Sequence, residues 1–394
     1  MQIRSPEWFS KTAASVDAAS RVELLSSTAF SELRDAIRHT LLSDEFALAE
    51  QWAQQLLLSH GDSATVGRET GSLWCEVCIH VSRPQQAKGV SEFLLRADLQ
   101  DEPHWWALRT RASLAVLSAA YLDAMIDAEA CLTLARILNR KDLQVRSHAL
   151  HALLHVRQIA SAKAIEHAQQ AVELADDLEP QFQDIAWWYL GNAWQHAGNS
   201  PNARDAYRKS RAAANLTGSR LAVSHAEFQL AVVLRQMDSL TEAHETFMRV
   251  ADYRSRVADV AGLAPIWCNL GHIERTRGEP AKAIVWYDRA AEQYAILGKQ
   301  HHEHDLRFYG AVARYEAGQH KPALQQLQAL VPFYRDVRQG KELDLVYEAM
   351  ALCFEAAGDF HRAREHELLV QDMRAGNPEV SSEPSRRLQP RRRV

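Results

Sequence analysis

Glycine and proline are scarce in this chain of 394 residues, which holds 16 and 12 of them. At their usual frequencies of about 7% and 5%, a protein of this length would hold about 28 and about 20. An all-β sandwich or barrel needs glycine- and proline-rich turns roughly every 8 to 12 residues, so this scarcity argues against an all-β fold. Hydrophobic residues still make up 47% of the chain. The composition therefore favours long helices that each bury one face.

Further absences narrow the class of protein. The five cysteines are too few for a disulfide framework in a chain this long, and no apolar run approaches the roughly 18 residues of a membrane span. The first residues, with Pro6, Glu7 and no apolar core, do not resemble a signal peptide. A net charge of -5 gives no general attraction to nucleic acid or to an anionic membrane. We therefore expect an intracellular, cytoplasmic protein.

A 40-residue period organises the second half of the chain. One clear copy consists of Trp187, Leu190, Gly191, Trp194, Gly198, Ala203 and Tyr207. The copy two periods later consists of Trp267, Leu270, Gly271, Glu274, Gly278, Ala283 and Tyr287. The apolar positions at the start of each copy are spaced i, i+3, i+4 and i+7, so they share one face of a first helix. Each copy is therefore expected to fold as a pair of helices.

Small residues recur where the two helices of a pair would meet. The eighth position of each copy holds only Gly or Ala, and the twentieth holds Ala in all five copies, at 203, 243, 283, 323 and 363. Small side chains allow two helix backbones to approach closely. The fifteenth position holds Gly or Asp, as in Gly198 and Asp238, where a short turn must leave the helical conformation.

This pattern resembles the tetratricopeptide repeat, whose standard period is 34 residues rather than 40. The longer form is similar to repeats in the sensor domains of bacterial transcription activators and of peptide-sensing regulators. The resemblance implies an all-α fold, a right-handed α-solenoid of about eight helix pairs. The expected organisation is an N-terminal capping helix at 1–28, degenerate repeats at 29–182, regular repeats at 183–374 and a disordered arginine-rich tail at 375–394.

The resemblance also implies a binding groove on the concave side, lined by the first helix of each pair. The groove positions map to Trp188, Asn192, Gln195, His225, Phe228, Arg235, Asn269, His272, Arg275 and Tyr315. Aromatic rings offer apolar area, while amide and guanidinium groups can hydrogen-bond a peptide backbone or a carboxylate. The carboxylate clamp of co-chaperone repeats is not expected, because only Asn192 matches its three positions and Trp188 and Gln229 depart from it.

Two patterns of cysteine and histidine are better explained by packing and by solvent exposure than by a metal site. Cys75 and Cys78 form a single CxxC that falls at core positions of a helix, and no second CxxC exists to complete a zinc site. The run from His301 to Asp305 lacks the spacing of a zinc protease motif, so we expect the charged start of a helix.

The sequence predicts a non-enzymatic scaffold or adaptor that binds a protein or peptide segment in the groove, with no cofactor and no bound metal. No nucleotide-binding, nucleophile-elbow or calcium-loop motif is present. One alternative is a ligand- or peptide-responsive regulatory sensor. Another is a metal-dependent enzyme built on His148, His151 and His155, which share one helical stripe. Nucleic acid is expected to contact at most the arginine-rich tail, weakly, and self-association stays open.

Overall fold

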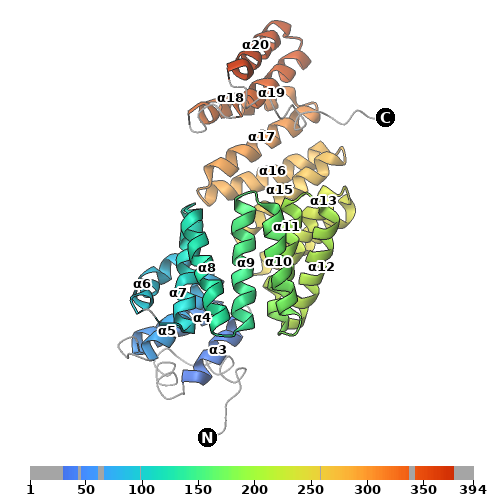
Figure 1. The fold of residues 1–394 in the computed structure, drawn as a ribbon. Helices are drawn as coiled ribbons and strands as arrows, with labels where there is room; N and C mark the ends of the chain where they lie inside the picture. Colours follow the sequence, from blue (N-terminus) through green and yellow to red (C-terminus); the bar gives the residue numbers. More distant parts are fainter. Residues whose placement is uncertain are drawn as a thin grey trace. The chain divides into compact units, whose positions relative to one another are not determined.

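The computed structural model describes residues 30–42, 46–60, 66–97, 99–257, 259–336 and 342–376. Within these ranges the chain forms eighteen α-helices, one short 3-10 helix and no strand, which confirms the expected all-α fold (Figure 1). The expected capping helix at 1–28 lies outside the described residues, as does the tail beyond Gly376. Among the described helices, none combines the length and the apolarity needed to cross a membrane.

The chain divides between Met237 and Asp238 into two compact units. The α-helices of unit 1 are α3 (Phe30–Leu42), α4 (Phe46–His60), α5 (Val66–His80), α6 (Lys88–Leu95), α7 (Glu102–Leu117), α8 (Tyr121–Ile137), α9 (Lys141–Arg157), α10 (Ser161–Ala175), α11 (Pro180–His196), α12 (Ser200–Thr217) and α13 (Arg220–Gln236). The 3-10 helix η1 (Pro84–Ala87) precedes α6. Successive helices from α3 to α12 pack as five pairs, and α13 packs against α12 (Figure 1). The predicted boundary between residues 182 and 183 falls inside α11, within unit 1.

Unit 2 is also built from helices that pack in successive pairs. Its helices are α14 (Leu240–Arg256), α15 (Val260–Thr276), α16 (Pro280–Ile296), α17 (Gln300–Glu316), α18 (His320–Asp336), α19 (Leu343–Ala356) and α20 (Phe360–Gly376). They form three pairs, α15/α16, α17/α18 and α19/α20, and α14 packs against α15. The described parts of the two units therefore hold eight helix pairs, and α13 and α14 lie on either side of the division between the units.

The small residues of the repeat lie where close helix packing was predicted. The five repeat alanines at 203, 243, 283, 323 and 363 are all buried. At Gly191, an added Cβ atom would lie 2.8 Å from the ring of Tyr207, and at Gly271 it would lie 2.6 Å from the ring of Tyr287. In these two pairs, the tyrosine ring of the second helix therefore rests directly on a glycine of the first helix.

The turns within the pairs use a left-handed backbone conformation. Gly198 has a φ angle of 74°, and Asp238, at the same position of the next copy, has a φ of 62°. The degenerate repeats place ordinary residues there, including Ile159 with a φ of 59°. A β-branched residue in this region is strained, because its Cβ crowds the backbone. The turn geometry of the regular repeats thus persists in the degenerate ones, where no glycine supports it.

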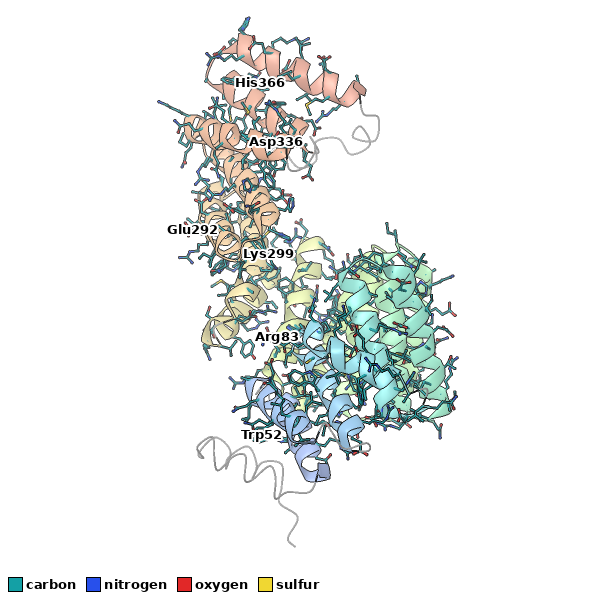
Figure 2. The ribbon with its side chains drawn as sticks, turned by 90° about the vertical axis from the view of Figure 1, so that its left-hand side faces the viewer. Trp52, Arg83, Glu292, Lys299, Asp336 and His366 are labelled. Carbon is teal, nitrogen blue, oxygen red and sulfur yellow. The ribbon has the colours of Figure 1, made fainter. Side chains whose placement is uncertain are left out.

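Large aromatic residues fill the core of the first helix pairs. Trp52 of α4, labelled in Figure 2, and Trp105 of α7 are almost completely buried. Trp105 also donates a hydrogen bond from Nε1 to Oγ of Ser147, 3.1 Å away on α9. This buried bond satisfies the indole group and ties α7 to α9 across neighbouring pairs.

Candidate functional site

A cavity of about 420 Å³ lies in unit 1, bordered by α3, α5, α7, α9 and the beginning of α11. Its lining is mostly charged and aromatic, and includes Arg38, Glu76, Glu102, Trp106, Arg140, Asp142, Arg146 and Phe182. Binding cavities usually combine apolar walls with a few polar groups that fix the orientation of a ligand. This cavity is more highly charged than that, so its charged groups decide what it can hold.

Arg146 is held between two aromatic rings of the cavity wall. Its Cζ atom lies 5.4 Å from the ring centroid of Trp106 and 5.3 Å from that of Phe182, distances typical of cation–π contacts. Burial lowers the pKa of Arg146, and Glu76 and Asp142 counteract this without reaching ion-pair distance. Within the described residues, its guanidinium has no hydrogen-bond partner. Because arginine stays charged in proteins, Arg146 presents to the cavity a cation that Glu76 and Asp142 offset only from beyond ion-pair distance.

The other two arginines of the cavity are already paired. Arg38 donates to Glu76 and Glu102 at 2.9 and 3.0 Å, and Arg140 donates to Glu102 at 2.8 Å. Arg140 also holds both carboxylate oxygens of Asp142, at 2.8 and 2.7 Å. Burial alone would raise the pKa of Glu102, but Arg38 and Arg140 outweigh it and the pKa is lowered. This network fixes the cavity wall and leaves Arg146 as its available donor.

The arrangement suits a carboxylate flanked by apolar groups. A guanidinium can donate two parallel hydrogen bonds to one carboxylate, and the rings of Trp106 and Phe182 both contact the guanidinium of Arg146. Burial and nearby Arg146 lower the pKa of His80, which also lines the cavity. An acidic side chain or a free C-terminus of an extended segment has the required chemistry.

Reasoning from the sequence did not find this cavity. Trp106 and Arg146 are one 40-residue period apart, so they occupy the same position of neighbouring repeats. Neither residue is among the groove residues predicted from the sequence, which begin at Trp188. An aromatic residue followed by an arginine one period later is the signal that could have indicated the site.

Three predicted groove residues lie on α11, and they are half-buried. The ring of Trp188 makes an edge contact with Tyr189, with centroids 4.9 Å apart, and its Nε1 is buried without a partner among the described residues. Oε1 of Gln195 accepts a hydrogen bond of 2.9 Å from the hydroxyl of Tyr207. Gln195 therefore helps to position the core tyrosine, while Trp188 keeps an unused donor.

Three more predicted residues lie on α13, which touches α11. His225 is exposed, and Phe228 and Arg235 are half-buried. Together with α11, they form the part of the predicted groove that belongs to unit 1. Whether these side chains contact a ligand stays a prediction.

The predicted residues of unit 2 are held by contacts within their own unit. Nδ1 of His272 lies 2.8 Å from the hydroxyl of Tyr287. Arg275 donates from Nε to both carboxylate oxygens of Glu316, each at 2.9 Å. Burial lowers the pKa of Arg275, but Glu316 outweighs it and the pKa is raised. Arg275 is thus paired inside the protein, in contrast to Arg146.

The remaining two predicted residues of unit 2 have different surroundings. Nδ2 of Asn269 donates to the carbonyl oxygen of Pro265, 2.8 Å away in the preceding turn of α15. The ring of Tyr315 lies against that of His320, with centroids 5.3 Å apart. Asn269 therefore supports its own helix, while Tyr315 is half-buried on α17.

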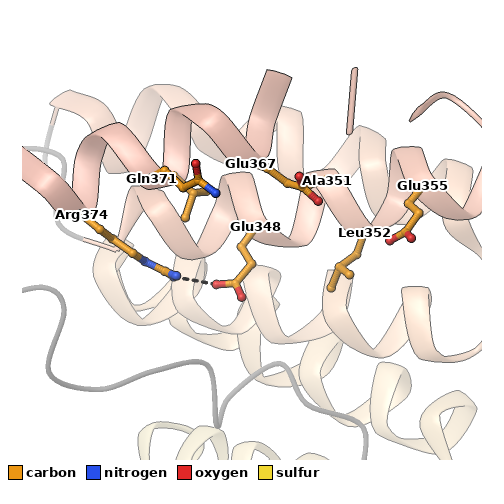
Figure 3. Close-up of a pocket in the computed structure, with 8 residues that line it drawn as sticks. Glu348, Ala351, Leu352, Glu355, Glu367, Gln371 and Arg374 are labelled. Carbon is orange, nitrogen blue, oxygen red and sulfur yellow. Dashed lines mark hydrogen bonds and ion pairs between the residues drawn. The ribbon is translucent and has the colours of Figure 1, made fainter. Parts of the chain in front are cut away.

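A smaller cavity of about 260 Å³ lies between α19 and α20 (Figure 3). Its basic group, Arg374, is paired with Glu348 at 2.7 Å and with Asp344 at 3.0 Å. Glu355 and Glu367 add further negative charge to the lining (Figure 3). This cavity is therefore less suited to a carboxylate than the one around Arg146.

The CxxC cysteines lie in the core, as the sequence predicts. Cys75 and Cys78 are both fully buried on α5. Burial raises the pKa of each thiol to about 12. Because the thiolate is the reactive and metal-binding form, both cysteines behave as small apolar residues. The histidine run at 301–304 lies in the first turns of α17, also as expected.

Comparison with known proteins identifies the fold. No protein-family model matches the chain, and no curated protein matches it in sequence. Among solved structures, it is similar to a signal-transduction ATPase with a tetratricopeptide repeat sensor from Pyrococcus horikoshii, with a TM-score of 0.61 and 10% identity over 91% of this chain. The chain spans 53% of that ATPase, about half of its length.

Two further structures are similar along almost their whole length. A Rap protein complexed with competence and sporulation factor has a TM-score of 0.59 and 12% identity, with 91% of this chain and 99% of that chain covered. Aspartyl phosphate phosphatase F from Bacillus subtilis has a TM-score of 0.54 and 10% identity, with 88% and 95% covered. The fold of this chain is therefore similar to that of a protein with a tetratricopeptide repeat sensor and to that of a Rap protein.

Proposed function

We propose that this protein is a non-enzymatic scaffold or adaptor that binds an extended peptide or protein segment, and that Arg146 receives a carboxylate of that segment. The observation that carries the proposal is the guanidinium of Arg146, clamped between Trp106 and Phe182 and facing a cavity without an ion-pair partner among the described residues. A buried cation is costly unless it is paired. A bound carboxylate would supply the missing pair.

The cavity is suited to recognition because its donor is held in place before binding. The rings on both sides restrict the side chain of Arg146, so little conformational entropy is lost when a ligand docks. A hydrogen bond to a charged group contributes about 1.5 to 3 kcal/mol. Loss of the guanidinium is therefore expected to weaken binding by about 10- to 150-fold.

The half-buried groove residues on α11 and α13 would extend the contact beyond the cavity. Trp188 has a buried indole donor without a partner among the described residues, and Asn192, one turn further on, already hydrogen-bonds Tyr207. Amide and indole groups of this kind can hydrogen-bond the backbone of an extended ligand. In this proposal, the cavity fixes one end of the ligand and α11 aligns the rest.

A second candidate function is a ligand-responsive regulatory sensor. The comparisons favour it, because two similar structures are described as a tetratricopeptide repeat sensor and as the quorum sensor NprR of Bacillus thuringiensis, the latter with a TM-score of 0.50. The similar Rap protein was solved with competence and sporulation factor bound. A sensor would change its compactness when ligand binds, which small-angle scattering of the free and bound protein would measure.

The non-enzymatic role is part of the proposal rather than a consequence of the fold. One structurally similar protein is named a phosphatase, so the fold alone does not separate binding proteins from enzymes.

The proposal is tested by selecting ligands from a library of short peptides that end in a free carboxylate. The best binders are then compared between the native protein, Arg146→Ala and Arg289→Ala by calorimetry. Arg289 is a matched control, because its Cζ lies 5.3 Å from the ring of Trp286 but it borders neither cavity described above. We expect Arg146→Ala to weaken binding at least tenfold and Arg289→Ala to leave it unchanged. Equal affinities of all three proteins would refute the role of Arg146.

A further inference from the structure

Four histidines gather between α9 and α10, away from the cavity of Arg146. His148, His151 and His155 lie on one face of α9, and His167 faces them from α10. The rings of His151 and His167 are nearly parallel, with centroids 4.6 Å apart, and those of His155 and His167 have centroids 5.4 Å apart. The cluster thus joins the two helices of a single pair.

Three of these histidines bring nitrogen atoms to one place. One ring nitrogen each from His151, His155 and His167 lie within 4.8 Å of one another, and no other such group of three possible ligands occurs among the described residues. From the sequence, no metal was expected, and the alternative considered was His148 with His151 and His155. The structure changes that set, because His167 takes the place of His148.

Three buried nitrogens of this cluster make no hydrogen bond within the described residues. Within the described residues, neither ring nitrogen of His151 makes a hydrogen bond, although His151 is only 2% exposed, and the buried Nδ1 of His155 makes none either. The backbone of Ala128 and the carboxylate of Glu129, whose Oε2 lies 3.6 Å from Nε2 of His151, approach without hydrogen-bond geometry. Buried polar atoms are nearly always satisfied, so these nitrogens point to a ligand.

We propose that His151, His155 and His167 bind a divalent transition-metal ion of the zinc type. Neutral imidazole nitrogens are preferred ligands of such ions. In a tetrahedral zinc site with Zn–N distances of about 2.1 Å, the ligand nitrogens lie about 3.4 Å apart. The three nitrogens therefore have to draw together by up to about 1.4 Å, and His155 and His167 are only half-buried and can rotate. Water or the exposed Glu129 would complete the coordination.

His148 has a supporting place in this site. Its Nδ1 lies 3.1 Å from Nδ1 of His167, so one of the two nitrogens donates to the other. When His167 is the donor, its Nε2 is left with a lone pair for the metal. A hydrogen bond of this kind fixes the tautomer and the orientation of a ligating histidine. His148 is thus a positioning residue, and the metal would bind α9 to α10, with Glu129 adding α8.

The test uses full-length protein purified without a histidine tag and stripped of metal. Zn²⁺ binding is measured by calorimetry, and Co²⁺ is added separately to record its visible spectrum. We expect one ion per chain, an intense tetrahedral Co²⁺ spectrum and a higher melting temperature with Zn²⁺. X-ray absorption of the zinc-loaded protein is expected to show three imidazole ligands. Absence of stoichiometric binding at micromolar zinc would overturn the proposal.

Variants separate this site from adventitious binding. His155→Gln with His167→Gln is expected to weaken zinc binding by at least about 100-fold, and His148→Gln by about 10- to 100-fold. The control is His301→Gln with His302→Gln at the start of α17 in unit 2, which is expected to keep native affinity. Circular dichroism checks that each variant is folded, and the single variant His155→Gln at a half-buried position serves if the double variant is not. Loss of affinity in the control, or unchanged affinity in His155→Gln, contradicts the assignment.

Discussion

Asp184 on α11 provides a sharp test of the packing in unit 1. Ser210 of α12 donates a hydrogen bond of 2.6 Å from its hydroxyl to Oδ1 of this carboxylate. Burial raises the pKa of Asp184 from 3.8 to about 6, although the bond from Ser210 counteracts it. The folded protein therefore binds this proton more tightly than the unfolded chain does, so the free energy of unfolding falls as the pH rises from about 4 to about 6.

The raised pKa of Asp184 sets the gain in stability that is expected when its carboxyl group is replaced. A difference of about two pKa units corresponds to at most about 3 kcal/mol, and partial solvent access reduces it to about 1 to 2 kcal/mol. Asp184→Asn is therefore expected to stabilise the protein by this amount above pH 7, and to have almost no effect near pH 4, where the native carboxyl is already protonated.

Urea unfolding followed by tryptophan fluorescence, at several pH values between 4 and 8, measures this difference. Asp205→Asn is the control, because Asp205 lies exposed on α12 and pairs only with its neighbour Arg204 among the described residues. It should change the free energy of unfolding by less than about 0.5 kcal/mol. A gain in Asp184→Asn that is equal at pH 4 and pH 8 would refute the reasoning.

Two further predictions concern the repeat itself and can be checked by thermal or urea unfolding. Gly271→Ala should destabilise the protein by about 1 to 3 kcal/mol, because the new Cβ would lie 2.6 Å from the ring of Tyr287; native stability of this variant would contradict the close packing. Ile159→Gly should instead stabilise it by about 0.5 to 1 kcal/mol, because Ile159 has a φ of 59° and is 90% exposed, so strain is relieved with little packing lost. A destabilised Ile159→Gly would show that this turn is not strained.

The sequence predicted the repeat architecture well because its signals are local. Gly191 and Ala203 lie 12 residues apart, and their place in a 40-residue period is enough to predict a turn and a tightly packed pair. The glycine positions also predicted the close approach seen at Tyr207. Such features need only the two helices of one repeat.

The cavity and the histidine cluster depend on contacts that the period does not encode. Arg146 meets Phe182 across two successive first helices, and the lack of a partner for its guanidinium is visible only when the whole wall is assembled. His167 lies on a second helix, whereas the search for metal ligands followed the stripe on α9. The predicted groove residues were mapped from the pattern of the tetratricopeptide repeat. That pattern does not show that Arg275 is already paired with Glu316.

The most direct test of carboxylate recognition is a thermodynamic cycle. A selected peptide is prepared with a free C-terminal carboxylate and with a C-terminal amide, and each form is measured against the native protein and against Arg146→Gln. If Arg146 receives that carboxylate, the amide weakens binding to the native protein but not to the variant, and the coupling energy is about 1.5 to 3 kcal/mol. A coupling energy below about 0.5 kcal/mol, with both peptides binding both proteins equally, would contradict the account.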